Sequence, residues 1–121
     1  MLDHGPVEDC LRALQKEAYA IAKSKGWHKE PNPVPQSLCL MHSEISEALE
    51  VYREGDFLSR VDSMKDAQGE LKPVGFGVEM ADVLIRVLDT CEEHGIDLGP
   101  ILLAKMDYNR RRQVGHGGKV C

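Results

Sequence analysis

The chain has 121 residues, a length typical of one domain, and 42% of them are hydrophobic, which is enough for a core. Its formal net charge of −5 argues against a nucleic-acid partner, because phosphate backbones bind to basic surfaces. No stretch has the length or apolarity of a membrane span or a signal peptide, so we expect a cytoplasmic protein without a membrane partner. The four scattered cysteines include no CxxC pair, so we expect neither a zinc site nor a disulfide framework.

Apolar residues at helical spacing predict two helices in the first half of the chain. The first begins near Pro6, a residue favoured at the first helical position, and ends at Gly26. Two prolines make residues 27–34 a loop. The second helix is expected over residues 35–54, and its predicted inner face carries Leu38, Met41, Ile45, Ala48, Leu49 and Tyr52.

The second half is predicted to hold two more helices. Residues 56–74 have a weak pattern that fits at most one short helix. A third helix is expected from about residue 75 to Gly95, and it is apolar on several sides, as in helices that are buried between subunits. A fourth follows Asp97. The short helix, if formed, would align Phe57, Val61 and Met64.

These elements predict an all-α fold of four helices in a single domain over residues 1–121, with a flexible tail from about residue 113. The apolar surface of the third helix needs more cover than three neighbours provide. We therefore expect a homodimer or a homotetramer.

Two acidic pairs are the candidate chemical groups. Glu44 and Glu47 lie three residues apart on the second helix, and Glu79 and Asp82 lie three apart on the third, so each pair shares a helix face. The spacing alone is weak, because roughly three such pairs are expected by chance for this composition. The placement of the second pair is more informative, since charges within the most hydrophobic helix are costly to bury.

Neighbouring carboxylates need relief from their repulsion. Two charges about 5.5 Å apart repel by roughly 3 kcal/mol at an effective dielectric near 20. Protonation, basic partners or a divalent cation can provide that relief, and hard oxygen ligands favour Mg²⁺, with Mn²⁺ as a substitute. The alternative is that both pairs are solvated edges of amphipathic helices.

Several ordered blocks of the sequence resemble one protein family. The blocks His42–Glu50 and Gly75–Ile85 are similar to the metal-binding helices of the MazG-like all-α nucleoside triphosphate pyrophosphatases. Lys105–Asn109 and His116–Lys119 are similar to later blocks of that family, and the likeness runs from about Gly26 onward. The 31 residues between Glu47 and Glu79 make a longer gap than the family commonly shows.

The resemblance implies an enzyme that hydrolyses nucleoside triphosphates, with some preference for deoxynucleotides, to the monophosphate and pyrophosphate in house-cleaning of the nucleotide pool. It implies that Glu44, Glu47, Glu79 and Asp82 bind Mg²⁺, which holds the triphosphate and activates water. Either Glu44 or Glu47 is then the catalytic carboxylate, with Glu47 preferred.

Five residues are candidate substrate contacts, each with a structural alternative, and the resemblance supports Lys105, Asn109 and Trp27 among them. Lys105 and Asn109 would bind phosphate or sugar, or form a solvated helix end. Arg86 would reach the nucleotide or pair with the acidic groups. Trp27 would stack on the base, accompanied by His28, or Trp27 would fill the core and His28 would be exposed.

Two other functions remain open from the sequence. One is a related diphosphohydrolase, such as a phosphoribosyl-ATP pyrophosphohydrolase. The other is a non-catalytic helical interaction module whose acidic pairs only decorate the surface.

Overall fold

The computed structural model describes residues 2–55 and 61–112. It is predominantly helical, as predicted, but a small sheet is present, so the expectation of an exclusively helical fold is wrong for residues 62–74. In chain order the elements are α1 (His4–Ser24), α2 (Val34–Arg53), β1 (Asp62–Lys65), β2 (Leu71–Val74), α3 (Phe76–Glu93) and α4 (Leu98–Arg111).

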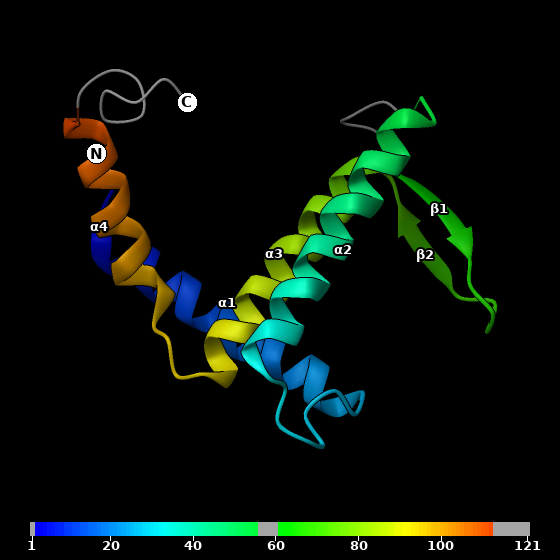
Figure 1. Ribbon diagram of the computed structural model, residues 1–121, viewed down its shortest axis with the longest axis horizontal. Coiled ribbons are helices and arrows are strands. Elements are labelled where there is room, and N and C mark those ends of the chain that lie inside the picture. The colour runs from blue at the N-terminus through cyan, green and yellow to red at the C-terminus, as the bar shows by residue number, and fades with distance from the viewer. Residues whose placement is uncertain (1, 56–60, 113–121) are drawn as a thin grey trace.

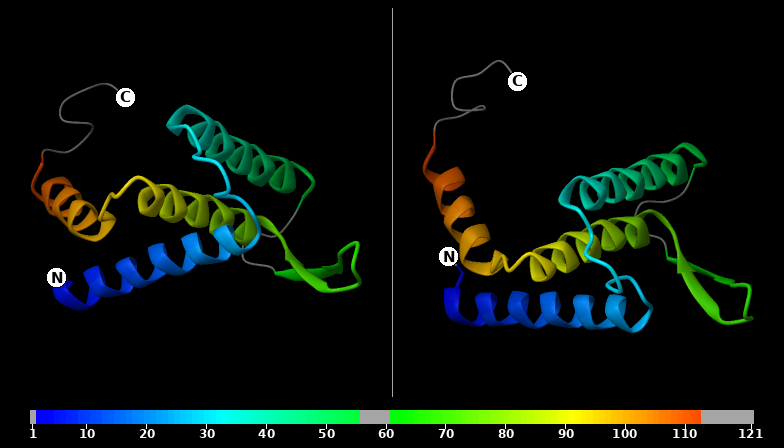
Figure 2. Two further views of the ribbon diagram at one scale, coloured as in Figure 1. Left: turned by 90° about the horizontal axis from the view of Figure 1, so that it is seen from below. Right: turned by 60° about the horizontal axis from the view of Figure 1, so that its bottom comes forward.

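The helix α3 is the centre of the arrangement. It packs against α1 and α2, whereas α4 packs against α1 and stands apart from α2 (Figure 1). The start of α4 approaches the backbone of α1 closely, because a Cβ atom at Gly99 would lie 3.1 Å from the Cα of Glu8. Figure 2 shows the result, in which α2 runs alongside α3 and α4 leaves from the end of α3 that lies near the start of α1.

The side chain of Gln15 joins α1 to the turn between α3 and α4. It is 2% exposed, its Nε2 donates to the carbonyl oxygen of Ile96 at 2.8 Å, and its Oε1 accepts from the backbone N–H of Leu98 at 3.0 Å. Nearby, Arg12 forms an ion pair with Asp97 at 2.8 Å. These contacts satisfy a buried amide and fix the direction in which α4 leaves α3.

The segment between α2 and α3 contains an antiparallel hairpin, in which Asp62 pairs with Val74. A polar turn closes it: Oδ1 of Asp66 accepts from the backbone N–H groups of Gln68 and Glu70, both at 2.9 Å, and Gly69 has a φ of +81°. The short helix that the pattern allowed is therefore absent from the described part of this segment. Val61 precedes β1, Met64 lies within β1, and Phe57 lies outside the described residues.

The buried hydrophobic core is small. Within residues 2–55 and 61–112 it consists of Ala18, Ala48, Leu88, Cys91 and Leu103. The prediction that the apolar face of α2 points into the core is wrong for the single chain, because most of that face is open to solvent. The buried residues of α2 are Ser37, Glu44 and Ala48. The exposed fractions are 48% for Leu38, 50% for Ile45, 56% for Leu49 and 56% for Tyr52.

Two further expectations concern membranes and cysteines. Among the described residues, no helix combines the length and apolarity that crossing a bilayer requires. Cys10, Cys39 and Cys91 are free thiols, and Cys91 is buried. The predicted tail from about residue 113, the block His116–Lys119 and Cys121 lie outside the described residues.

Candidate functional site

Three of the four predicted metal ligands meet between α2 and α3. One carboxylate oxygen from each of Glu44, Glu79 and Asp82 lies within 4.8 Å of the others. The meeting follows from the packing of the two helices, since Glu44 belongs to the inward face of α2 and the other two lie near the start of α3. We call these three residues the acidic cluster.

One oxygen of the acidic cluster has an unmet bonding requirement. Oε2 of Glu79 is buried and has no hydrogen-bond partner among the described residues. Burying such an acceptor without a partner costs free energy. Glu79 lies in the first turn of α3, where the helix dipole favours negative charge but does not replace a direct partner.

The pKa values of the carboxyl groups are raised at this site. Burial is the main cause for Glu79 and Asp82, followed by the negative charge of Asp82 on Glu79 and of Glu44 on Asp82. Two cations oppose the shift at Asp82, namely Arg86 and the hairpin residue Lys72. The site therefore holds more negative charge than its own surroundings neutralise.

Glu47 lies beside the acidic cluster and outside the group of three. Its side chain is exposed, yet its pKa is raised, first by a hydrogen bond to Glu44 and then by the charge of Glu44. A hydrogen bond with Glu79 lowers the pKa of Glu47, and the charge of Asp82 raises it. The predicted fourth ligand is thus electrostatically part of the site and accessible to solvent.

Arg86 contacts the acidic cluster directly. Its Nε donates to Oε1 of Glu44 at 2.8 Å, so the predicted ion-pair alternative is observed. Its guanidinium carbon also lies 5.0 Å from the ring centroid of Trp27, within the range of a cation–π contact. Arg86 therefore connects the acidic cluster to the loop after α1.

The donor set is suited to a hard divalent cation. All of the converging groups are carboxylates, one buried oxygen lacks a partner, and no histidine or cysteine belongs to the acidic cluster. Oxygen ligands of this kind favour Mg²⁺ or Mn²⁺ over zinc. The residues present fit the cofactor that the sequence implies.

A cavity of about 410 Å³ borders the acidic cluster. Trp27 lines it and is 50% exposed, so the alternative that this residue fills the core is wrong. Glu44, Asp82 and Arg86 line it on the side of the acidic cluster, and Glu17, Lys25 and Asp89 add further charged groups. The rest of the wall is mostly apolar, with Leu14, Ala18, Ile21, Ala22, Ile85 and Leu88.

His28 occupies a different position from its neighbour Trp27. Its side chain is 3% exposed, so the alternative of an exposed residue is wrong. Nε2 lies 2.7 Å from Oδ1 of Asp89, and Nδ1 lies 3.1 Å from Oε2 of Glu93. His28 is therefore enclosed by protein groups and does not line the cavity beside Trp27.

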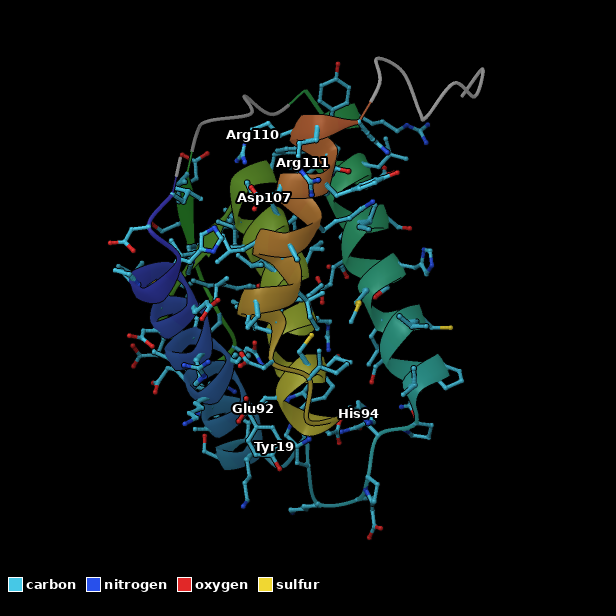
Figure 3. The ribbon with its side chains drawn as sticks, turned by 90° about the vertical axis from the view of Figure 1, so that its left-hand side faces the viewer. Tyr19, Glu92, His94, Asp107, Arg110 and Arg111 are labelled. Atoms are coloured by element: carbon cyan, nitrogen blue, oxygen red, sulfur yellow. The ribbon has the colours of Figure 1, made fainter. Side chains whose placement is uncertain are left out.

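Lys105 and Asn109 are not brought to the acidic cluster of their own chain. Both are exposed on α4, which packs against α1, and Nζ of Lys105 lies 4.7 Å from the ring centroid of Tyr108. Figure 3 shows the C-terminal end of α4, marked by Arg110 and Arg111, at the opposite end of the view from Tyr19 and His94.

The sequence reasoning missed the partners of His28, which are Asp89, Glu93 and Asn32. A signal was available, because Asp89 and Glu93 lie four residues apart within the most hydrophobic helix, where paired carboxylates need a cation.

Comparisons with known protein families, with curated proteins and with solved structures found no match for this chain.

Proposed function

We propose that this chain is a Mg²⁺-dependent nucleoside triphosphate pyrophosphohydrolase of the MazG-like all-α type, acting in the cytoplasm. The observation that carries the proposal is the acidic cluster, whose three carboxylates include a buried oxygen without a partner and adjoin a largely apolar cavity. This combination suits a ligand with both a polyphosphate and an aromatic base.

In the proposed reaction, water attacks the α-phosphorus, the bond from that phosphorus to the bridging oxygen breaks, and pyrophosphate leaves. Glu44, Glu47, Glu79 and Asp82 would hold Mg²⁺, which supplies positive charge for the triphosphate and makes the attacking water more acidic. Glu47 would take the proton of that water, because it is the exposed carboxylate of the four and lies beside the acidic cluster.

The cavity would hold the nucleoside. Trp27 offers one exposed aromatic face for stacking, and Arg86 lies between this face and Glu44, near the position of the phosphates. The volume of about 410 Å³ lies in the range of small-molecule sites. The base is therefore enclosed by apolar side chains and the phosphates lie at the acidic edge.

We propose further that the working form contains at least two copies. Among the described residues, twenty large hydrophobic side chains are exposed, against five buried hydrophobic residues. A groove of about 370 Å³ between α2 and α3 is almost entirely apolar, with Ile45, Ala48, Leu49, Tyr52, Phe76 and Met80 along it. Apolar surface of this extent usually marks an interface. A second copy would cover it.

The second copy would also supply the missing cations. α4 carries Lys105 and Asn109 away from the acidic cluster of its own chain, and its C-terminal turn is basic. In a symmetric pair, each α4 would reach the negatively charged site of the other chain. In this proposal, the two predicted α4 contacts would lie in the partner's site.

The test is a pyrophosphate-release screen of the whole chain over standard and modified nucleoside and deoxynucleoside triphosphates, with Mg²⁺ and with EDTA. We expect release that requires Mg²⁺ and is lost in Glu79→Gln. Glu50→Gln is the matched control, because Glu50 lies on the same helix as Glu44, is exposed and is outside the acidic cluster.

Two outcomes would replace the proposal. Turnover of phosphoribosyl-ATP, included in the same screen, without turnover of any nucleoside triphosphate would assign the related diphosphohydrolase activity. No turnover, together with no thermal stabilisation by Mg²⁺ and a non-hydrolysable nucleotide, would favour a helical interaction module.

A further inference from the structure

The side chain of His28, in the loop after α1, lies between two carboxylates of α3. Asp89 and Glu93 are one turn apart on α3, and each has a carboxylate oxygen within hydrogen-bond distance of one ring nitrogen of His28, at 2.7 Å and 3.1 Å. A neutral imidazole donates from one nitrogen only, whereas the protonated ring donates from both. The arrangement therefore matches a charged His28.

The loop supplies a second set of bonds to the same place. The backbone N–H of Asn32 donates to Oε2 of Glu93 at 3.1 Å, and its Nδ2 donates to the same atom at 3.0 Å and to the carbonyl oxygen of Trp27 at 3.1 Å. Nδ2 of Asn32 also lies 3.1 Å from Nδ1 of His28, but its two acceptors already satisfy it. His28 and Asn32 thus attach the loop to α3 at two points.

Two further titratable groups lie near His28 and its partners. From α1, the ring of Tyr19 lies 4.3 Å from the ring of His28, centroid to centroid. The other oxygen of Glu93 lies 3.7 Å from Nε2 of His94. Figure 3 shows Tyr19, Glu92 and His94 at one end of the molecule, which is the end where α3 finishes.

We propose that protonated His28 is a latch that fixes the loop of residues 25–33 on α3 and so positions the indole of Trp27 at the cavity. Trp27 and His28 are adjacent in the chain, and the indole faces Arg86 and the cavity next to the point at which His28 holds the loop on α3. His28 is a positioning residue in this account, and the inference does not depend on what the cavity binds.

The latch should open as the pH rises. Burial lowers the pKa of His28, but the hydrogen bonds to Asp89 and Glu93 outweigh it and leave the pKa raised. Burial likewise acts against the ionised form of Glu93, but the bonds from Asn32 and His28 leave its pKa lowered. A raised histidine pKa means that the latch is fully formed below the unfolded value near 6.5 and is lost as the pH rises through the folded value.

The chain contains its own reporter for this opening, because Trp27 is its only tryptophan. We would measure iodide quenching of tryptophan fluorescence on the whole chain between about pH 5 and pH 9, and the titration of His28 by NMR of labelled histidine. In the wild type, we expect His28 to titrate above its ordinary value and the quenching to increase over the same pH interval.

Three variants make the test decisive. In His28→Gln the pH-dependent step in quenching should disappear, whereas His4→Gln, which changes an exposed histidine on α1, should keep it. In Asp89→Asn, which retains His28, the midpoint should fall by about 1 pH unit or more. The latch is overturned if His28 titrates at or below its ordinary value, if the step survives in His28→Gln, or if Asp89→Asn leaves the midpoint unchanged. Circular dichroism shows whether His28→Gln is folded, and if it is not, Asp89→Asn alone decides.

Discussion

Arg86 and Glu44 form a 2.8 Å hydrogen bond that joins α3 to α2 at the edge of the acidic cluster. The two side chains are largely enclosed, with 26% and 12% of their surfaces exposed. The bond offsets part of the negative charge of the site. It also ties the site to the indole of Trp27, over which the same guanidinium lies.

Replacing Arg86 with methionine should destabilise the chain in the absence of metal. The change removes a charge-assisted hydrogen bond, typically worth about 1.5–3 kcal/mol, and leaves Glu44 with less compensation. Urea denaturation in EDTA measures the loss, and Mg²⁺ should stabilise this variant more than the wild type. Lys16→Gln, at an exposed position of α1, is the control, and an equal denaturation midpoint for the wild type and Arg86→Met would contradict the role given to the bond.

The acidic cluster should make stability in EDTA fall as the pH rises. The pKa values of Glu47, Glu79 and Asp82 are raised in the folded chain, so the folded state binds more protons than the unfolded state over the interval between the two sets of values. The stabilisation by these groups is thus present below the unfolded values and is lost as the pH rises through the folded values. Mg²⁺ should cancel the loss.

Thermal melting with EDTA and with Mg²⁺, from about pH 4 to pH 8, measures this effect. The gap between the two melting temperatures should widen with pH in the wild type and in Glu50→Gln. In Glu79→Gln the gap should be nearly absent, and the EDTA melting temperature at neutral pH should be higher than in the wild type. If the difference between the two melting temperatures did not depend on pH, the carboxylates of the acidic cluster would not be the groups that bind the cation.

The apolar groove between α2 and α3 should hold the copies together. Leu49→Glu places a charge in this groove and should convert the oligomer to monomers in sedimentation velocity. Leu71→Glu is the matched control, because Leu71 is 72% exposed on β2 and lies outside the groove. A wild-type chain that sediments as a monomer at micromolar concentration would refute the proposed pairing.

Contacts between copies can be assigned by mixing two inactive variants. Glu79→Gln removes a cluster carboxylate and Lys105→Ala removes the α4 cation, so neither variant alone should release pyrophosphate. If α4 serves the site of the partner, refolding an equal mixture should restore about one quarter of the wild-type sites, because half of the pairs are mixed and each has one intact site. No recovery in mixtures that do form mixed pairs would place Lys105 in its own chain's site or outside any site.

Much of the helical framework could be predicted from the sequence, because the apolar spacing and the terminating glycines are local signals. The hairpin could not, since Asp62–Lys65 alternates no apolar residues and is exposed throughout. Its clearest local sign is the turn that ends in Gly69, whose aspartate side chain caps two backbone N–H groups.

The candidate site could be predicted only for pairs of acidic residues that lie on the same face of one helix. Spacing identified Glu44 with Glu47 and Glu79 with Asp82, and the packing of α2 on α3 then brought three of them together. The bonds of His28 span 61 and 65 residues of chain, so no local pattern encodes them. The outward apolar face of α2 was misassigned for a related reason, because periodicity identifies an apolar face and does not identify what covers it.

Binding of Mn²⁺ followed by electron paramagnetic resonance tests the central claim most directly, since it detects the cation without requiring the correct substrate. The free-ion signal should fall on addition of the wild-type chain and of Glu50→Gln, and it should persist with Glu79→Gln and with Asp82→Asn. Equal loss of the signal with all four proteins, or no loss with the wild type, would contradict a cation site built from α2 and α3.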